Sequence, residues 1–261
     1  MALRRLLRYL NFAIAAFLVA ALAAVYWCAW RPLPRASGSV RGPVSARAVI
    51  VRDTRGMAHI EAGSLEDVFF LQGYAAAQDR MFQMDLLRRT AAGELAEVAG
   101  AAALAADQEA RRMRLRRLAE DCAARLTPGD RAMLAAYARG VNHYLDASRG
   151  RLPLEFSLLR YDPRPWSVVD SVLVVLSLRN SLERSWRSEL RKEEMLAAGD
   201  RARVEFLYSL RPGGEARGAS NAWAVSGGRT ASGLPLLAAD PHLEFTMPSL
   251  WRLDHLKGPG L

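Results

Sequence analysis

The chain has 261 residues, half of them apolar, and a formal net charge of +9. A chain of this length and composition buries a sizeable core, which excludes disorder as its main state. Five arginines and no acidic residue lie in residues 1–35, which leaves +4 for the rest, where arginines alternate with acids as in ERSWRSELRKEE (183–194). A solvated helical surface explains this pattern better than a phosphate-tracking stripe, so we do not expect nucleic acid as a partner.

An uncharged apolar run, FAIAAFLVAALAAVYWCAW, occupies residues 12–30 and is as long as a bilayer core requires. Arginines precede it, and Tyr26, Trp27 and Trp30 cluster at its far end, where aromatic rings favour the membrane interface. We predict a membrane segment within residues 1–35 that anchors a periplasmic or otherwise extracytoplasmic protein. A cleavable signal peptide is the alternative, because Ala21-Leu22-Ala23 fits a peptidase site, but the apolar run continues past it.

Residues 31–43 are rich in Pro, Gly and Ser and predict a linker. The short β-type runs 48–53 and 57–62 then predict a hairpin. Ser64 followed by Asp67 resembles a capping box, and the apolar spacing behind it predicts helix up to about residue 125, with a break near Gly100.

Two further helix starts are indicated at Thr127-Pro128 and at Ser167 with Asp170, so residues 64 to about 207 are predicted to be mainly helical. The pattern then changes to strands, with NAWAVS (221–226) and LPLLAAD (234–240) joined by a polar turn. A further strand begins in 249–258, and the sequence stops at Leu261 in the middle of this pattern. We therefore expect the chain to be the N-terminal part of a longer protein.

Ser220 lies in the loop-like stretch GASNAWAVSG (218–227), with no histidine or carboxylate next to it. A conventional triad needs a base that is oriented by a third group. The candidates are His59, His242 and His255 with Asp53 or Asp240, but the G-x-S-x-G spacing of a nucleophile elbow is absent at Ser220. Alternatively, a cut before Ser220 would free an α-amine of reference pKa near 8, which is partly neutral at physiological pH and can serve as the base.

Six sequence segments resemble the penicillin acylase family of N-terminal-nucleophile hydrolases. Ser220-Asn221-Ala222-Trp223 followed by RTASGLPLLAADPHL (229–243) resembles the start of the family's β-chain. The family's α-chain is resembled, in the same order, by IVRDTRGMAHIEA (50–62), GYAAAQDRMFQMDLLRRTAAGELAEVAG (73–100), YARGVNHYL (137–145) and LPLEFSLLRYDPRPW (152–166). The resemblance covers residues 44 to 261, and only the predicted membrane segment lies outside it.

The resemblance implies an α+β fold, in which a mainly helical α-chain (36–219) surrounds the first strands of a β-chain (220–261) in an incomplete four-layer αββα sandwich. It implies cleavage between Ala219 and Ser220 by the Ser220 hydroxyl, through an N-to-O acyl shift. The mature enzyme would then attack an amide with Ser220, using its own α-amine as general base. Many members carry glycine where this chain has Ala219, which is small enough for the same attack.

Two more site residues come from the resemblance. His242 matches a histidine that hydrogen-bonds near the nucleophile in cephalosporin-acylase-like members, although a loop histidine before a strand would look the same. Glu189 matches a carboxylate that joins a structural calcium site, although an exposed helical glutamate is an equal reading. No organic cofactor is implied. The family's oxyanion asparagine and most calcium ligands lie downstream of Leu261, so we expect residues 1–261 alone to have no useful activity.

The expected reaction is hydrolysis of a linear amide in a small N-acyl compound, such as a β-lactam antibiotic or an acyl-homoserine lactone. Arg179, Leu182 and Glu183 match positions near the family's acyl pocket, which argues against a purely aromatic acyl group. The other expected partner is the remainder of the β-chain. The alternatives are a membrane-tethered helical binding module without catalysis, in which Ser220 is only a turn residue, or a degenerate relic.

Overall fold

The computed structural model describes residues 2–34, 37–182, 185–209, 220–243 and 245–261. The chain forms two compact units, one of Met1–Val175 with Arg252–Leu261 and one of Leu176–Trp251. The first unit contains most of the helices and a three-stranded sheet, and the second contains two further helices and a two-stranded ribbon. Residues 210–219, which include Ala219, lie outside the described part.

The N-terminal segment of the first unit is helical, as the apolar run predicts. Helix α1 spans Ala2–Val25, and a π-helical turn spans Tyr26–Trp30. Within it, Arg4–Trp30 is long and apolar enough to cross a membrane, and its side chains are exposed. A signal sequence has the same length and composition, so these features suit an anchor and a signal equally.

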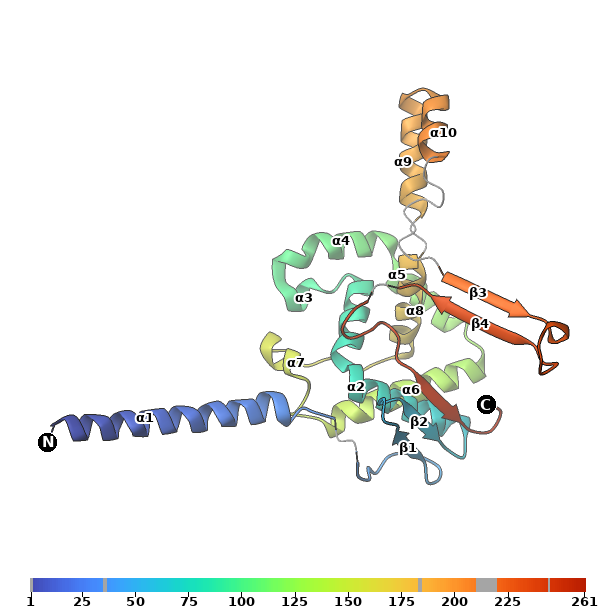
Figure 1. Cartoon of the computed structure of the whole chain (residues 1–261). Coiled ribbons are helices and arrows are strands. Elements are labelled where there is room, and N and C mark those ends of the chain that lie inside the picture. Colours follow the sequence, from blue (N-terminus) through green and yellow to red (C-terminus); the bar gives the residue numbers. More distant parts are fainter. Residues whose placement is uncertain (1, 35–36, 183–184, 210–219, 244) are drawn as a thin grey trace. The chain divides into compact units, whose positions relative to one another are not determined.

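A small sheet follows the linker. Strands β1 (Val49–Arg52) and β2 (Ala58–Glu61) pair antiparallel, which confirms the predicted hairpin. Strand β5 (Asp254–Lys257) comes from the far end of the sequence and pairs parallel with β2, so the strand order is β1-β2-β5 (Figure 1). Ala58, Ile60 and Ala62 are buried and pack with Val68 and Ala75 of the following helix.

The long helix α2 (Leu65–Ala92) begins where the capping residue predicts, because the hydroxyl of Ser64 accepts a hydrogen bond from the Asp67 backbone nitrogen at 3.1 Å. It ends at Gly93, whose left-handed conformation (φ 69°) gives a C-cap. The predicted break near Gly100 is also present, because the short helix Ala96–Ala99 ends there and Gly100 has a φ of 73°. A further break falls at Arg114, also at positive φ. The helices that follow are α3 (Ala96–Ala99), a 3-10 turn (Gly100–Ala103), α4 (Leu104–Met113), α5 (Leu115–Ala124), α6 (Pro128–Ala147), α7 (Leu154–Leu159) and α8 (Val168–Leu182).

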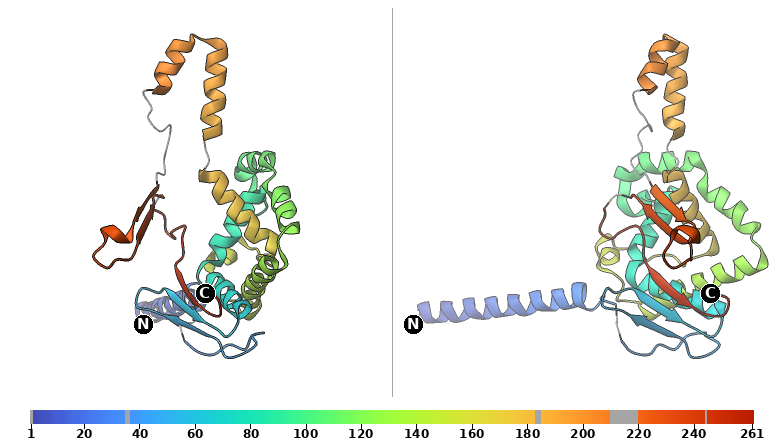
Figure 2. Two further views of the ribbon diagram at one scale, coloured as in Figure 1. Left: turned by 90° about the vertical axis from the view of Figure 1, so that its right-hand side faces the viewer. Right: turned by 45° about the vertical axis from the view of Figure 1, so that its right-hand side comes forward.

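Helices α2 and α6 lie side by side and form the main helical contact of the first unit (Figures 1 and 2). A Cβ atom at Gly73 would overlap the carbonyl oxygen of Tyr137, and one at Gly140 would overlap that of Phe70. The two backbones therefore touch at these glycines, more closely than ordinary side chains allow. Around this contact lies the core: Ala77, Met81, Ala138, Val141, Tyr144, Phe156 and Trp166.

Further along its length, α2 buries a network of charges centred on Asp85. Arg88 donates from Nε to Asp85 Oδ1 at 2.8 Å, and Arg89 Nε and the Tyr161 hydroxyl both donate to Oδ2 at 2.8 Å. Burial raises the pKa of Asp85, but the charge of Arg88 and the hydrogen bonds from Arg89, Tyr161 and Arg88 outweigh it, so the pKa lies below its usual value. Every buried charge here thus has a partner, as stability requires.

The second unit contains α9 (Ser185–Ala198), α10 (Arg201–Ser209), β3 (Ser220–Val225), a 3-10 turn (Gly227–Arg229) and β4 (Leu236–Pro241). Strands β3 and β4 pair antiparallel, as predicted, and the residues of both strands are exposed. The described structure is therefore mainly helical with a few strands, which agrees with the α+β class. The four-layer sandwich stays a prediction.

Replacing Gly140 by alanine tests the helix contact. The added methyl group must push α6 away from the Phe70 carbonyl, so we expect Gly140→Ala to lower the free energy of unfolding by about 1–3 kcal/mol. Gly129→Ala is the control, because its methyl group would meet nothing closer than the Thr127 hydroxyl at 4.0 Å. Urea titrations that give equal stabilities for the two variants would show that the backbones do not touch.

Replacing Asp85 by asparagine tests the buried network. The change keeps the shape but leaves Arg88 and Arg89 without their shared carboxylate, so we expect a loss of about 3–5 kcal/mol at pH 7. Because the folded-state pKa of Asp85 is depressed, its contribution is present above the unfolded value of 3.8 and is lost as the pH falls through the folded value. Asp146→Asn, whose pair with Arg149 is exposed, should cost about 0–1 kcal/mol. If the loss of unfolding free energy in Asp85→Asn were as large in acid as at pH 7, the ionised Asp85 would not be what stabilises the network.

Candidate functional site

Ser220 is the first residue of β3 and lies opposite Pro241 of β4. It is exposed, and its hydroxyl has no hydrogen-bond partner among the described residues. The preceding residue of the predicted cleavage site, Ala219, lies outside the described residues. The predicted nucleophile thus sits at one end of the two-stranded ribbon, at the point where a strand presents both its backbone nitrogen and its side chain.

His242 directly follows Pro241, the last residue of β4, which pairs with Ser220, so it lies at the same end of the ribbon. Its Nε2 lies 2.6 Å from Oδ2 of Asp240 and 3.5 Å from Nδ2 of Asn221. A carboxylate only accepts hydrogen bonds, so the N–H at Nε2 donates a hydrogen bond to Asp240, and in the neutral ring Nδ1 is then the acceptor nitrogen. Asn221 and Asp240 are direct cross-strand neighbours, which brings these three polar side chains together.

Side-chain alternation separates Ser220 from this group. Ser220 shares a face with Pro241, whereas Asn221 and Asp240 share the other face, because successive side chains of a strand point to opposite sides. Among the described residues, His242 therefore makes no hydrogen bond to the Ser220 hydroxyl. The ribbon contains an aspartate–histidine pair near the serine, but the nucleophile–base hydrogen bond of a conventional triad is missing.

Asp240 is one of the two carboxylates that the sequence offers as the orienting group of a conventional triad. The structure places it beside His242, as such a triad requires, but among the described residues the pair is not hydrogen-bonded to Ser220. The signal is present in the sequence, since Asp240 and His242 are only two positions apart at the end of β4.

The other candidate histidines lie in the first unit. His59 and His255 face each other across β2 and β5, with 3.1 Å between their Nδ1 atoms, and His59 Nε2 lies 3.5 Å from Asp53 Oδ2. Within the described part of the chain, no serine hydrogen-bonds to either ring. These residues are therefore cross-strand neighbours and not parts of a serine triad.

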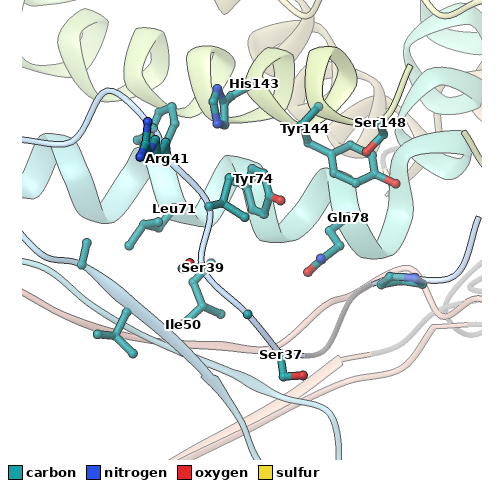
Figure 3. Close-up of a pocket in the computed structure, with 18 of the residues that line it drawn as sticks. Ser37, Ser39, Arg41, Ile50, Leu71, Tyr74, Gln78, His143, Tyr144 and Ser148 are labelled. Atoms are coloured by element: carbon teal, nitrogen blue, oxygen red, sulfur yellow. The ribbon is translucent and has the colours of Figure 1, made fainter. Parts of the chain in front are cut away.

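A cavity of about 800 Å³ lies in the first unit between the linker, β1, α2 and α6. Leu71, Tyr74 and Gln78 line it from α2 and His143 from α6, with Ser39 on the linker side (Figure 3). Nε2 of His143 is buried without a hydrogen-bond partner in the part of the chain that the structure describes. The cavity thus brings serines and a histidine to one place, but it contains no bonded nucleophile–base pair.

Glu189 lies on α9 and is exposed. Among the described residues, no group of three or more His, Cys, Asp or Glu side chains is placed to hold a metal ion. Calcium takes six to eight oxygen ligands, so Glu189 with its described neighbours does not make a complete site. The resemblance also places three residues near the acyl pocket. Arg179 and Leu182 lie in the last turn of α8, and Glu183 lies outside the described residues.

Comparison with known proteins gives consistent results. The family model described as penicillin amidase matches residues 47–261. Penicillin acylase 2 proenzyme of Pseudomonas sp. (strain SE83) is 34% identical over 262 residues, covering 86% of this chain and 34% of that protein. Acyl-homoserine lactone acylase QuiP of Pseudomonas aeruginosa is 32% identical over 269 residues, covering 87% of this chain and 31% of that protein. This chain thus spans about a third of the length of these relatives.

A solved structure of a thermostable penicillin G acylase from Alcaligenes faecalis is also similar. Its TM-score is 0.53 at 26% sequence identity, and the match covers 63% of this chain and 90% of that chain. The family match extends over helices α2 to α10, the β1–β2 hairpin and the β3–β4 ribbon alike. The chain belongs to the penicillin amidase family.

Proposed function

We propose that this chain is the N-terminal part of a precursor that cuts itself before Ser220 and then hydrolyses a linear amide. The observation that carries the proposal is the position of Ser220 at the very start of β3, beside the Asp240–His242 pair. A new N-terminus at this residue would place an amine and a hydroxyl together at an exposed strand end. Membership of the penicillin amidase family and the proenzyme named among its relatives support this reading.

The first reaction is an internal acyl shift. The Ser220 oxygen attacks the carbonyl carbon of Ala219, the carbon–nitrogen bond breaks, and the nitrogen takes up the hydroxyl proton to become a free amine. Water then hydrolyses the resulting ester, which leaves a carboxylate on Ala219 and restores the hydroxyl of Ser220. The products are an α-chain of residues 36–219, with or without the N-terminal segment, and a β-chain that begins at Ser220.

The second reaction is catalysis by the mature enzyme. The α-amine of Ser220, with a reference pKa near 8, is partly neutral at physiological pH and accepts the hydroxyl proton as the oxygen attacks the substrate carbonyl. The proton passes to the leaving amine, and water hydrolyses the acyl-enzyme on Ser220. This scheme supplies a base for the Ser220 hydroxyl, to which no side chain of the described residues hydrogen-bonds.

His242 and Asp240 act as positioning residues in this scheme. With its Nε2 proton held by Asp240, His242 keeps Nδ1 as an acceptor for a donor such as the freed amine. A hydrogen bond of this kind would orient the amine toward the hydroxyl of Ser220. The Asn221 amide, 3.5 Å from Nε2, flanks the same ring.

The substrate is a small N-acyl compound with a linear amide, such as a β-lactam antibiotic or an acyl-homoserine lactone. The names of the two relatives, a penicillin acylase and an acyl-homoserine lactone acylase, support this class. The partner of the α-chain is the complete β-chain. In this proposal residues 1–35 act as an anchor or as an export signal, so that the enzyme works on the outer side of the cytoplasmic membrane; the long apolar helix Arg4–Trp30 supports it. A structural calcium ion that includes Glu189 would need further oxygen ligands from outside the described residues.

Self-processing is tested by expressing the full reading frame and sequencing the N-termini of the purified product. We expect a new chain that starts Ser-Asn-Ala-Trp and expect Ser220→Ala to abolish it, because alanine has no hydroxyl to attack the Ala219 carbonyl. Ser226→Ala is the matched control, since Ser226 is an exposed serine just after the same strand and should leave processing unchanged. A cut that persists in Ser220→Ala, or an uncut chain that hydrolyses amides, would contradict the mechanism.

The positioning role of Asp240 is tested on the imidazole of His242. Removing the carboxylate with Asp240→Ala takes away the acceptor that holds the proton on Nε2, so we expect ¹⁵N NMR shifts to change from one tautomer to a mixture. Asp200→Ala, which removes an exposed carboxylate that bonds only near the start of α10, should leave the His242 signals unchanged. A single Nε2-protonated tautomer in Asp240→Ala would show that Asp240 does not position the ring.

A further inference from the structure

The proposed cut before Ser220 falls, in the sequence, between strand β5 and its sheet partner β2. Residues 254–257 follow Ser220, yet they pair with β2 in the register Ala58↔Asp254, His59↔His255, Ile60↔Leu256 and Glu61↔Lys257. A backbone hydrogen bond from Ala62 N to Lys257 O, 3.2 Å long, continues this pairing. After a cut before Ser220, β5 would be bound to β2 only by noncovalent contacts.

Four charged side chains cluster beside this strand pair. Arg252, just before β5, donates from Nε to Asp79 Oδ2 at 3.0 Å and from Nη1 to Asp254 Oδ2 at 2.6 Å. Arg52 of β1 meets Asp79 with both terminal nitrogens at 2.8 Å and also reaches Gln78 at 2.8 Å. Asp79 therefore accepts hydrogen bonds from two arginines: Arg52, which precedes the proposed cut, and Arg252, which follows it.

The cluster is largely withdrawn from water. The exposed fractions of the side chains are 18% for Arg52, 21% for Asp79, 15% for Arg252 and 9% for Asp254. Burial raises the pKa of Asp254 in spite of the charge of Arg252, and burial raises the pKa of the adjoining Tyr137 to about 12. Ion pairs in such surroundings are screened less than exposed ones, and losing one partner leaves an uncompensated charge.

Close packing flanks the charges. Ile60 of β2 is buried, and Leu256 of β5 packs against the same apolar cluster as Val68 and Ala75 of α2. A Cβ atom at Gly258 would come within 2.8 Å of a methyl carbon of Val68, so the backbone after β5 lies directly on α2. The contact of the β5 segment with β2 and α2 thus combines buried apolar side chains, strand pairing and ion pairs, as protein–protein interfaces do.

We propose that Arg52 and Asp79 form a docking site on the α-chain for Arg252 of the β-chain, which keeps the two chains together after cleavage. The partner that this site fits is the 252–258 segment of the same precursor, and the inference rests on the proposed cut before Ser220. Asp79 is the central residue, because it binds the arginines of both chains. The Glu61–Lys257 pair between the same strands is more than 60% exposed on both sides and adds little.

The test is a double-mutant cycle of Arg252→Met and Asp79→Asn in the full reading frame. In the processed protein, we measure the urea concentration at which the two chains separate on a sizing column, and from it the ratio of separated to associated chains. Each single change should raise that ratio by about tenfold or more, because it strands a partly buried charge. The double variant should be much less affected than the product of the two single effects.

Two controls and one replacement variant accompany the cycle. Lys257→Met, at the exposed pair, should change the ratio by less than about threefold. Asp254→Asn should cost less than Asp79→Asn, because burial already raises the pKa of Asp254, whereas Asp79 holds both arginines. If Arg252→Met does not accumulate, Arg252→Lys replaces it in the same cycle, since lysine keeps the charge but loses the fork geometry.

The uncut Ser220→Ala precursor allows the docking site to be tested independently of the proposed cleavage. There β5 is tethered, so its docking is intramolecular, and the same variants should lower stability less than in the processed protein. If no cut occurs in the parent protein, the cleavage proposal fails, while coupling between Arg252 and Asp79 in the uncut chain still supports the site. Independent, additive effects of Arg252→Met and Asp79→Asn in either form would overturn the docking site.

Discussion

The close contact between α2 and α6, at which Gly73 and Gly140 let two helix backbones touch, supports the other parts of the first unit. Because α2 is held in this way, one end of it packs under the β1–β2–β5 sheet through Val68 and Ala75. Its middle presents Asp79 to two arginines, and its later turns bury Asp85 with Arg88 and Arg89. One helix thus carries an apolar face, a charged contact to β5 and a buried ionic core. Its non-helical residue, Arg80, directly follows Asp79.

Local features of this structure could be predicted from the sequence, because their causes are local. The β1–β2 hairpin, the caps at Ser64 and Thr127, and the β3–β4 ribbon all follow from nearby turn residues and side-chain spacing. The break at Arg114 could not be predicted, because arginine at positive φ has no compositional signal. The predicted break at Gly100 is present, whereas the earlier helix end at Gly93 was not predicted.

Long-range pairings are the part that the sequence did not reveal. The parallel pairing of β2 with β5 joins segments almost 200 positions apart, and no spacing rule specifies such a partner. The contact of Arg252 with Asp79 depends on that pairing and was equally hidden. For the candidate site, the position of Ser220 at a strand start was predictable, and Asp240 and His242 are already candidate partners because they lie two positions apart in the sequence.

The chemistry proposed for Ser220 depends on one constraint, which is that no described side chain hydrogen-bonds to its hydroxyl. In the proposed mechanism, the base is the backbone nitrogen of Ser220, which is locked in a peptide bond until the chain is cut. The most direct test blocks that amine in the processed enzyme with cyanate at neutral pH, where an α-amine of pKa near 8 reacts in preference to lysines near 10.4. The mechanism predicts that amide hydrolysis is lost while the hydroxyl of Ser220 stays intact. Full hydrolysis by an enzyme whose Ser220 amine is carbamylated would contradict it.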